Sequence, residues 1–222
     1  NGQSFSYTYD NVGNITSVTR NGLTTTYEYD SLGQLTRDND PHAGKSTMYL
    51  YDCGGNMTGY LSAPYTLAPT LEGVNETVFY TYGDSNWKDK VTAIGGKAIT
   101  YDAIGNPLTY DGWTFTWKAG RMLASMVKTG TNAQFTYDHN GMRIRKVVNG
   151  VTTNYTLNGK NVVHMTQGGY DLHFFYDAQG KPAMVRFNGT DYFYIYNLQN
   201  DAVAIVDTNG TQVVEYGYDA WG

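Results

Sequence analysis

The stretch Tyr9–Thr16 reads YDNVGNIT, and it decides the fold because it recurs along the chain. Close copies begin at Tyr29, Tyr51 and Tyr101, and shorter Tyr-Asp-x-x-Gly copies begin further on. The residues that we assign to structural repeat turns are Tyr9, Asp10, Gly13, Tyr29, Asp30, Gly33, Tyr51, Asp52, Gly55, Tyr101, Asp102, Gly105, Tyr137, Asp138, Gly141, Tyr176, Asp177, Gly180, Tyr218, Asp219 and Gly222.

The spacing of the copies is regular. Tyr9 and Tyr29 lie 20 residues apart, and Tyr29 and Tyr51 lie 22 residues apart. Self-similarity on such a period is typical of repeat proteins, so residues 1–222 are predicted to form a single array of about ten units of roughly 20 residues each. Weaker copies that lack the aspartate keep a similar spacing, at Trp117, Tyr155 and Tyr196.

One interval breaks the period. Tyr51 and Tyr101 lie 50 residues apart, and the stretch between them contains Pro64 and Pro69. One inserted loop of roughly 12–18 residues would restore the period, so we interpret the non-repetitive segment near 61–74 as a loop insert.

The motif has a simple physical reading as a turn between strands. An aspartate at its first position can accept hydrogen bonds from backbone N–H groups two residues on, and a glycine at its fourth position tolerates positive φ. Before the turn, Phe5, Tyr7 and Tyr9 alternate with Ser6 and Thr8. This period of two in strand-forming residues predicts β-strands.

Second turns are expected between the Asp-x-x-Gly turns. Asn-Gly and Asp-Gly pairs favour the tight turns of β-hairpins. Each unit is therefore predicted to be two short strands and two turns, which makes the chain all-β, an array of antiparallel β-hairpins. The pairs lie at Asn21-Gly22, Asp111-Gly112, Asn149-Gly150, Asn158-Gly159, Asn188-Gly189 and Asn209-Gly210.

A sheet built in this way has one face rich in aromatic and aliphatic residues and one polar face. Because sheets twist with a fixed hand, a long array is predicted to form a curved, spiralling sheet. Its open end strands are adhesive unless they are covered. We therefore expect the isolated fragment to self-associate or to curl into a partial barrel.

Composition excludes several classes of protein. Aromatic residues make up 15% of the chain and charged residues 16%, which argues against intrinsic disorder. A single cysteine excludes an internal disulfide scaffold. The net charge of −5 argues against a nucleic-acid partner. No apolar run reaches the roughly 18 residues of a membrane span.

The recurring Tyr-Asp-x-x-Gly-Asn-x-Thr unit resembles the YD repeat of Rhs-family proteins, over nearly the whole chain outside the insert. That family includes bacterial polymorphic toxins, insecticidal toxin-complex subunits, wall-associated bacterial proteins and teneurins. The resemblance implies a hollow β-shell that encapsulates a C-terminal toxin, in a secreted or cell-surface protein. The chain starts and stops within the pattern, so we expect a fragment of a longer array, upstream of the core segment that ends such arrays.

Two hypotheses for function follow. The first is a non-enzymatic shell segment whose partners are the rest of its own repeat array and an encapsulated C-terminal domain. The second is a cell-surface adhesion or carbohydrate-binding module, because aromatic faces also stack on sugars. Under the first hypothesis the Tyr and Trp side chains pack against one another on the apolar face of the sheet. Under the second, some of them contact a ligand.

Catalytic, cofactor-binding and metal-binding residues are not assigned. The four histidines, including His42, show no metal-ligand spacing. The residues Asp38–Asp40 before His42 suggest either a solvated turn or an ion site with too few oxygen ligands. Cys53 is interpreted as an incidental thiol. The recurring aspartates are interpreted as turn residues, since catalysis would need one pair at one site.

Overall fold

The structure is a computed structural model, and it describes residues 4–221. It contains 21 β-strands and, within those residues, no helix. The all-β prediction is therefore confirmed. The chain divides into two compact units, one ending at Ile99 and one beginning at Thr100. The prediction of one array over 1–222 stays a prediction.

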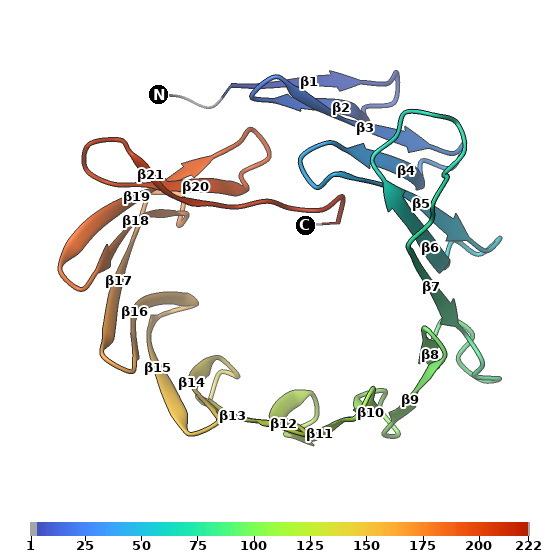
Figure 1. The fold of residues 1–222 in the computed structure, drawn as a ribbon. Helices are drawn as coiled ribbons and strands as arrows, with labels where there is room; N and C mark the ends of the chain where they lie inside the picture. Colours follow the sequence, from blue (N-terminus) through green and yellow to red (C-terminus); the bar gives the residue numbers. More distant parts are fainter. Residues whose placement is uncertain (1–3, 222) are drawn as a thin grey trace. The chain divides into compact units, whose positions relative to one another are not determined.

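The first unit is a run of antiparallel strands in chain order (Figure 1). Every strand pairs with the next one along the chain. Its strands are β1 (Phe5–Tyr9), β2 (Ile15–Arg20), β3 (Leu23–Tyr29), β4 (Leu35–Asp40), β5 (Lys45–Tyr51), β6 (Met57–Pro64), β7 (Glu76–Thr81), β8 (Ala93–Ile94) and β9 (Lys97–Tyr101), which contains the boundary.

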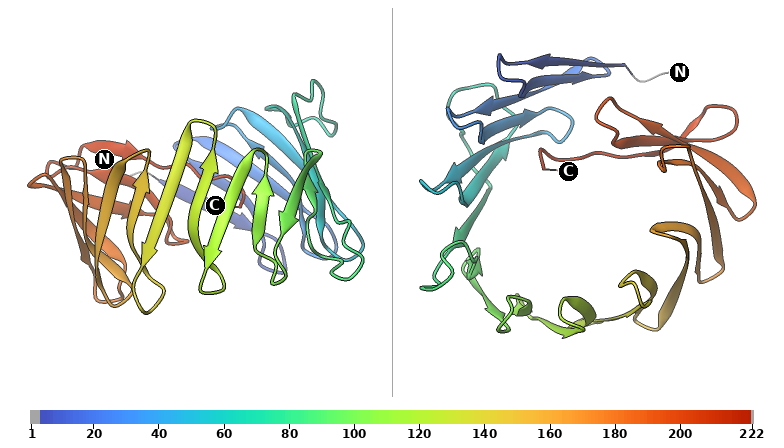
Figure 2. Two further views of the ribbon diagram at one scale, coloured as in Figure 1. Left: turned by 90° about the horizontal axis from the view of Figure 1, so that it is seen from below. Right: turned by 180° about the vertical axis from the view of Figure 1, so that it is seen from behind.

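The second unit continues the same pattern, and its successive strands follow a curved path (Figure 1). Seen from the side, these strands run alternately up and down (Figure 2). They are β10 (Pro107–Tyr110), β11 (Trp113–Lys118), β12 (Met122–Lys128), β13 (Thr131–Tyr137), β14 (Arg143–Val148), β15 (Val151–Asn158), β16 (Asn161–Gln167), β17 (Tyr170–Tyr176), β18 (Pro182–Phe187), β19 (Thr190–Tyr196), β20 (Ala202–Val206) and β21 (Gln212–Glu215).

Two kinds of turn connect the strands. Most of the two-residue hairpin turns place both central residues at positive φ, as at Asn21 (50°) and Gly22 (81°). Asparagine and glycine tolerate this conformation, which matches the twist of paired strands. The turn predicted at Asn158-Gly159 lies one residue later, at Gly159-Lys160, because Asn158 pairs with Asn161. Asn209-Gly210 differs from our prediction, because it forms the second half of an Asp-x-x-Gly turn that starts at Asp207.

The predicted insert at 61–74 begins too early. Leu61–Pro64 belong to β6, where Leu61 pairs with Met48 of β5 and with Thr77 of β7. Pro64 is tolerated because it is the last residue of the strand. The irregular segment therefore runs over 65–75.

This segment is fixed to the first unit by buried polar groups. The Arg37 guanidinium donates to the carbonyl oxygens of Thr66 and Pro69, each at 3.1 Å, and to the Asn39 amide oxygen at 2.8 Å. The Ser46 hydroxyl donates to the Thr66 carbonyl at 2.9 Å. Arg37 is only 4% exposed, so the segment closes over a charge that has all these bonds.

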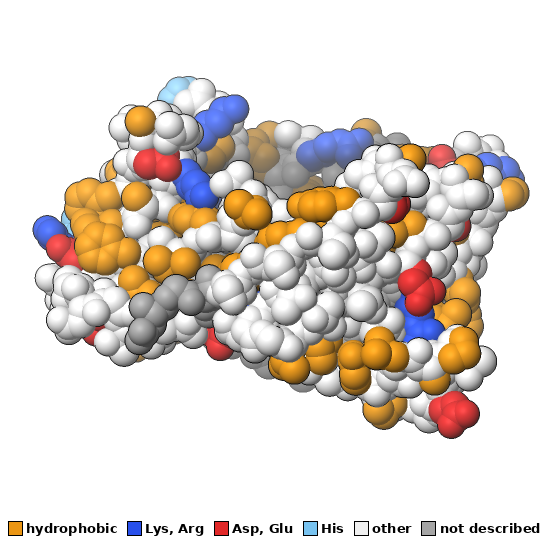
Figure 3. Space-filling model, turned by 90° about the horizontal axis from the view of Figure 1, so that it is seen from above, with side chains coloured by type: hydrophobic (Ala, Val, Ile, Leu, Met, Phe, Trp, Pro, Cys, Tyr) orange, Lys and Arg blue, Asp and Glu red, His pale blue; other side chains and the backbone are white. Residues whose placement is uncertain are grey.

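The core of each unit is thin because each sheet is a single layer of strands. Strand β11 alternates half-buried and exposed residues, in agreement with the predicted period of two. Many apolar side chains remain in contact with solvent (Figure 3), and Leu198 is 77% exposed. The few buried apolar residues are Leu35, Tyr49, Ala63, Ala133, Val185, Val203, Ala204 and Ile205. Residues 4–221 hold no helix with the length and hydrophobicity that a membrane crossing requires.

Candidate functional site

The Asp-x-x-Gly turn is held by a compact set of hydrogen bonds, shown by the turn at Asp10. The main-chain N–H of Gly13 donates to the Asp10 carbonyl at 3.3 Å, and the Asp10 N–H donates to the Asn14 carbonyl at 2.9 Å. The Asp10 carboxylate accepts from the N–H groups of Val12 and Asn14 at 3.0 and 2.8 Å. The Asp10 side chain thus satisfies two of the backbone donors of the turn.

The same arrangement recurs throughout the described residues. In each copy the first side chain accepts from the N–H groups two and four residues on. Asn197 replaces aspartate in one weak copy and makes the same bonds. Trp221 donates to Asp219 at 2.8 Å, while Gly222 lies outside the described residues. The complete copies start at Asp30, Asp52, Asp102, Asp138, Asp177, Asn197 and Asp207.

The hydroxyl of the motif tyrosine donates a hydrogen bond to a main-chain carbonyl in the preceding repeat. The Tyr29 hydroxyl donates to the Ile15 carbonyl at 2.9 Å, and the Tyr176 hydroxyl donates to the Val162 carbonyl at 2.7 Å. Tyr196 makes the same contact with Pro182. We call this set the tyrosine ladder; its donors are Tyr29, Tyr51, Tyr82, Tyr137, Tyr176, Tyr196 and Tyr218, with the Trp117 indole N–H in the equivalent place.

A β-bulge explains why these side chains reach the neighbouring repeat. The strand register shifts between Glu28 and Tyr29, between Thr136 and Tyr137, and at the motif tyrosine of other repeats. A bulge redirects the side chain that follows it. The aromatic ring is therefore aimed along the edge of the sheet, toward the end of the previous turn.

Neighbouring turns also touch directly. The Asn106 amide donates to the Gly120 carbonyl of the next turn at 2.8 Å, and the Lys181 ammonium donates to the Asn200 side chain at 2.9 Å. In these two turns the residue after the motif glycine reaches forward to the next turn, while the motif tyrosines reach back to the preceding repeat. Sequence reasoning missed this connection, although the recurrent amide after the glycine signals it.

The ionisation of these groups fits a structural arrangement. Hydrogen bonds from the Asn56 side chain and then from its backbone lower the pKa of Asp52. Burial, followed by the charge of Asp10 in the preceding turn, raises the pKa of Tyr29. Asp52 therefore remains an anionic acceptor, and Tyr29 remains a neutral donor.

Other sequence candidates lie apart from these turns or at their surface. Cys53 is exposed in the turn that starts at Asp52. His42 lies in an exposed turn, where its main-chain N–H donates to the Asp40 carboxylate at 2.8 Å.

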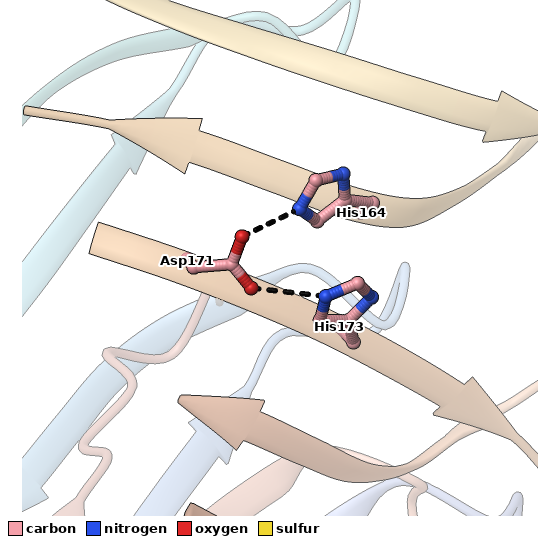
Figure 4. A group of neighbouring side chains, drawn as sticks. All are labelled: His164, Asp171 and His173. Carbon is pink, nitrogen blue, oxygen red and sulfur yellow. Dashed lines mark hydrogen bonds and ion pairs between the residues drawn. The ribbon is translucent and has the colours of Figure 1, made fainter. Parts of the chain in front are cut away.

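The structure brings together one cluster that sequence reasoning missed. Nε2 of His164 and Nε2 of His173 lie 3.0 and 2.9 Å from the two carboxylate oxygens of Asp171 (Figure 4). The feature of the sequence that could have revealed this cluster is the Gly168-Gly169 pair. Read as a two-residue hairpin turn, it pairs His164 with His173 across β16 and β17.

Repeated strand pairs with a carboxylate-closed turn, and a tyrosine bond from each repeat to the one before it, define a YD-repeat shell protein of the Rhs type. The Teneurin YD-shell family matches residues 2–222, and the chain belongs to this family.

Curated relatives agree with this placement. The chain is 33% identical over 181 residues to the tRNA3(Ser)-specific nuclease WapA of Bacillus spizizenii, and 33% identical over 181 residues to the tRNA nuclease WapA of Bacillus subtilis. Each match covers 78% of this chain. The chain spans only 7% of the length of these relatives.

Solved structures show the same fold. A Photorhabdus luminescens Tc holotoxin pore structure matches this protein with a TM-score of 0.67 and 17% identity. The match covers 99% of this chain and 13% of the chain in the holotoxin structure. The TcdB2-TccC3-Cdc42 structure matches 99% of this chain and 13% of that chain, with a TM-score of 0.69 and 16% identity. At these identities the likeness concerns the fold.

Proposed function

We propose that this segment of a YD shell is a non-enzymatic wall that encloses a polypeptide, the C-terminal domain of its own protein. The observation that carries the proposal is the tyrosine ladder. Each rung joins the strand that leads into one Asp-x-x-Gly turn to the strand that leaves the previous one, and it adds to the backbone pairing of these two strands. The ladder therefore favours a continuous wall over separate repeats.

The turn carboxylates support a structural role. Each recurring aspartate is engaged by amides of its own turn, as Asp30 is by the N–H groups of Leu32 and Gln34 at 2.9 Å. General acid–base catalysis instead needs carboxylates aimed at a shared substrate. The WapA relatives are named as nucleases, but the match spans 7% of their length. We assign any comparable activity to residues outside the matched stretch.

Enclosure would serve a protein that must carry an unfolded or harmful domain without exposing it. A wall of paired strands presents few unpaired backbone groups along its length, and only the end strands need covering. The partners would then be the rest of the shell and the enclosed domain. A secreted or cell-surface location accompanies this role.

Protease protection tests the proposal. The longer natural protein that contains this segment and its downstream domain is treated with protease, next to the downstream domain produced alone. Enclosure predicts that the downstream domain survives in the longer protein under conditions that digest it alone. Equal digestion rates would overturn the proposal.

A further inference from the structure

Three side chains converge on one face of the β16–β17 hairpin. Asp171 and His173 are two residues apart on β17, so they point to the same side, and His164 faces His173 from β16. The two imidazole rings stack with their centroids 4.3 Å apart and their planes 14° from parallel. The Asp171 carboxylate lies between their Nε2 atoms (Figure 4).

The local sequence fixes this arrangement. Gly168 and Gly169 have φ values of 54° and 90°, so they form the two-residue turn of the hairpin. His164 lies four residues before the turn and His173 lies four residues after it, and the register therefore places them opposite each other.

We propose that His164, Asp171 and His173 form a binding site for a divalent transition-metal ion, with Zn²⁺ as the best match. Two imidazole nitrogens and one carboxylate oxygen make a ligand set that suits zinc and its neighbours in the first transition row. A fourth position, open to solvent, would be filled by water.

The distances require little rearrangement. The three potential ligand atoms lie within 4.8 Å of one another. Ligands at zinc's usual bond lengths of about 2.0–2.2 Å lie roughly 3.4 Å apart in a tetrahedron. The side chains are partly exposed, His164 by 29%, His173 by 47% and Asp171 by 49%, so they can turn by the order of an ångström that closure needs.

The surrounding charges permit a cation. Arg186 pairs with His173 across the next strand and lies on the same face. Its guanidinium is engaged by Asp191, with Nε 2.6 Å and a terminal nitrogen 3.1 Å from the carboxylate oxygens. The Asp171 carboxylate is therefore the charge available to an incoming ion.

A bound ion would connect β16 to β17 through side chains. Because it would bind the folded hairpin and not the extended chain, it would also raise the stability of the second unit. This effect is separate from enclosure, and it does not depend on the proposed function.

The test is calorimetric titration of the chain with Zn²⁺, followed by Ca²⁺. We expect one zinc ion per chain. His164→Ala and His173→Ala should each weaken binding at least about tenfold, the scale on which loss of a supporting group already affects metal sites. Ca²⁺ prefers more oxygen ligands, so it should bind far more weakly.

Matched controls distinguish this site from general imidazole binding. His42→Ala and His139→Ala remove histidines outside the cluster and should leave the zinc affinity unchanged. Asp171→Asn keeps the shape of the side chain but lacks its charge, and it should weaken binding while circular dichroism shows an intact sheet. Equal affinity in the cluster variants and in the controls would overturn the site, as would Ca²⁺ binding as tight as Zn²⁺ binding.

Discussion

The Tyr29 hydroxyl donates a 2.9 Å hydrogen bond to the main-chain carbonyl of Ile15, the residue that follows the Asp-x-x-Gly turn of the preceding repeat. Tyr176 and Val162 repeat the relationship 14 residues apart in the second unit. The contact links repeats that are adjacent in sequence. In repeat proteins, such nearest-neighbour contacts add to the stability of each unit.

The turn aspartate should be replaceable by asparagine more readily than by alanine. Asparagine keeps an oxygen that accepts from the N–H groups of Leu32 and Gln34, as Asn197 does naturally in its own turn. Asp30→Ala should lower the free energy of unfolding by about 1 kcal/mol, and Asp30→Asn by less. Urea denaturation of the two variants measures the difference, and equal losses would contradict this role of the side-chain oxygen.

The motif glycine should show a backbone effect without a steric one. Gly180 has φ of 80°, and a Cβ built there meets nothing within 4 Å. Gly180→Ala should therefore cost about 1–2 kcal/mol through the left-handed conformation alone. Gly180→Asn should cost less, because Asn200 occupies the equivalent position at φ 69°. If thermal denaturation shows the alanine variant as stable as the wild type, the turn geometry is wrong.

Acid should weaken the turns. Hydrogen bonds from the Asn56 side chain lower the folded-state pKa of Asp52 from its ordinary 3.8, and hydrogen bonds from the Thr211 N–H do the same for Asp207. An aspartate whose pKa is lower in the folded state than in the unfolded state stabilises the fold, and this contribution is complete when the pH is above the ordinary pKa. This contribution is lost as the pH falls through 3.8 and then through the lower folded value.

The measurement is the urea midpoint between about pH 6 and about pH 3, which should decline in the acid part of that range. In Asp52→Asn the decline should be smaller, since one of the titrating turns no longer titrates. A midpoint that is flat with pH would contradict the prediction.

Arg37 should hold the irregular segment 65–75 in place. Arg37→Met removes the charged donor to the Thr66 and Pro69 carbonyls, and Thr66 then keeps only its bond from the Ser46 hydroxyl. The loss should be about 3 kcal/mol, since charged hydrogen bonds are among the stronger ones. Limited proteolysis should then cut within 65–75 faster than in the wild type. Arg145→Met, at an exposed arginine, is the control and should leave the cleavage rate unchanged.

Much of the fold could be predicted from local chemistry. The period-two alternation around Tyr7 and the Asn21-Gly22 turn specify strands and hairpins through forces that act within a few residues. The start of the irregular segment could not be found in this way. Leu61 and Pro64 lie outside the recognisable repeat and are therefore predicted to belong to the loop, whereas pairing with β5 and β7 extends the strand to Pro64.

The contacts between repeats were the part that local reasoning missed. The Tyr29 ring was expected to fill an apolar face, but a bulge at Glu28–Tyr29 turns it toward the carbonyl of Ile15. The meeting of His164 with His173 depends in the same way on the register of a hairpin. Both features arise from pairing between strands, which composition and spacing describe only indirectly.

The most direct measurement compares two tyrosines that occupy the same position of the motif. Among residues 4–221, Tyr29 has its acceptor in the preceding repeat, whereas Tyr9 is 57% exposed and its hydroxyl forms no such rung. The free energy of unfolding should fall by about 1 kcal/mol in Tyr29→Phe and stay within a few tenths in Tyr9→Phe. Equal changes in the two variants would contradict a wall joined by the tyrosine ladder.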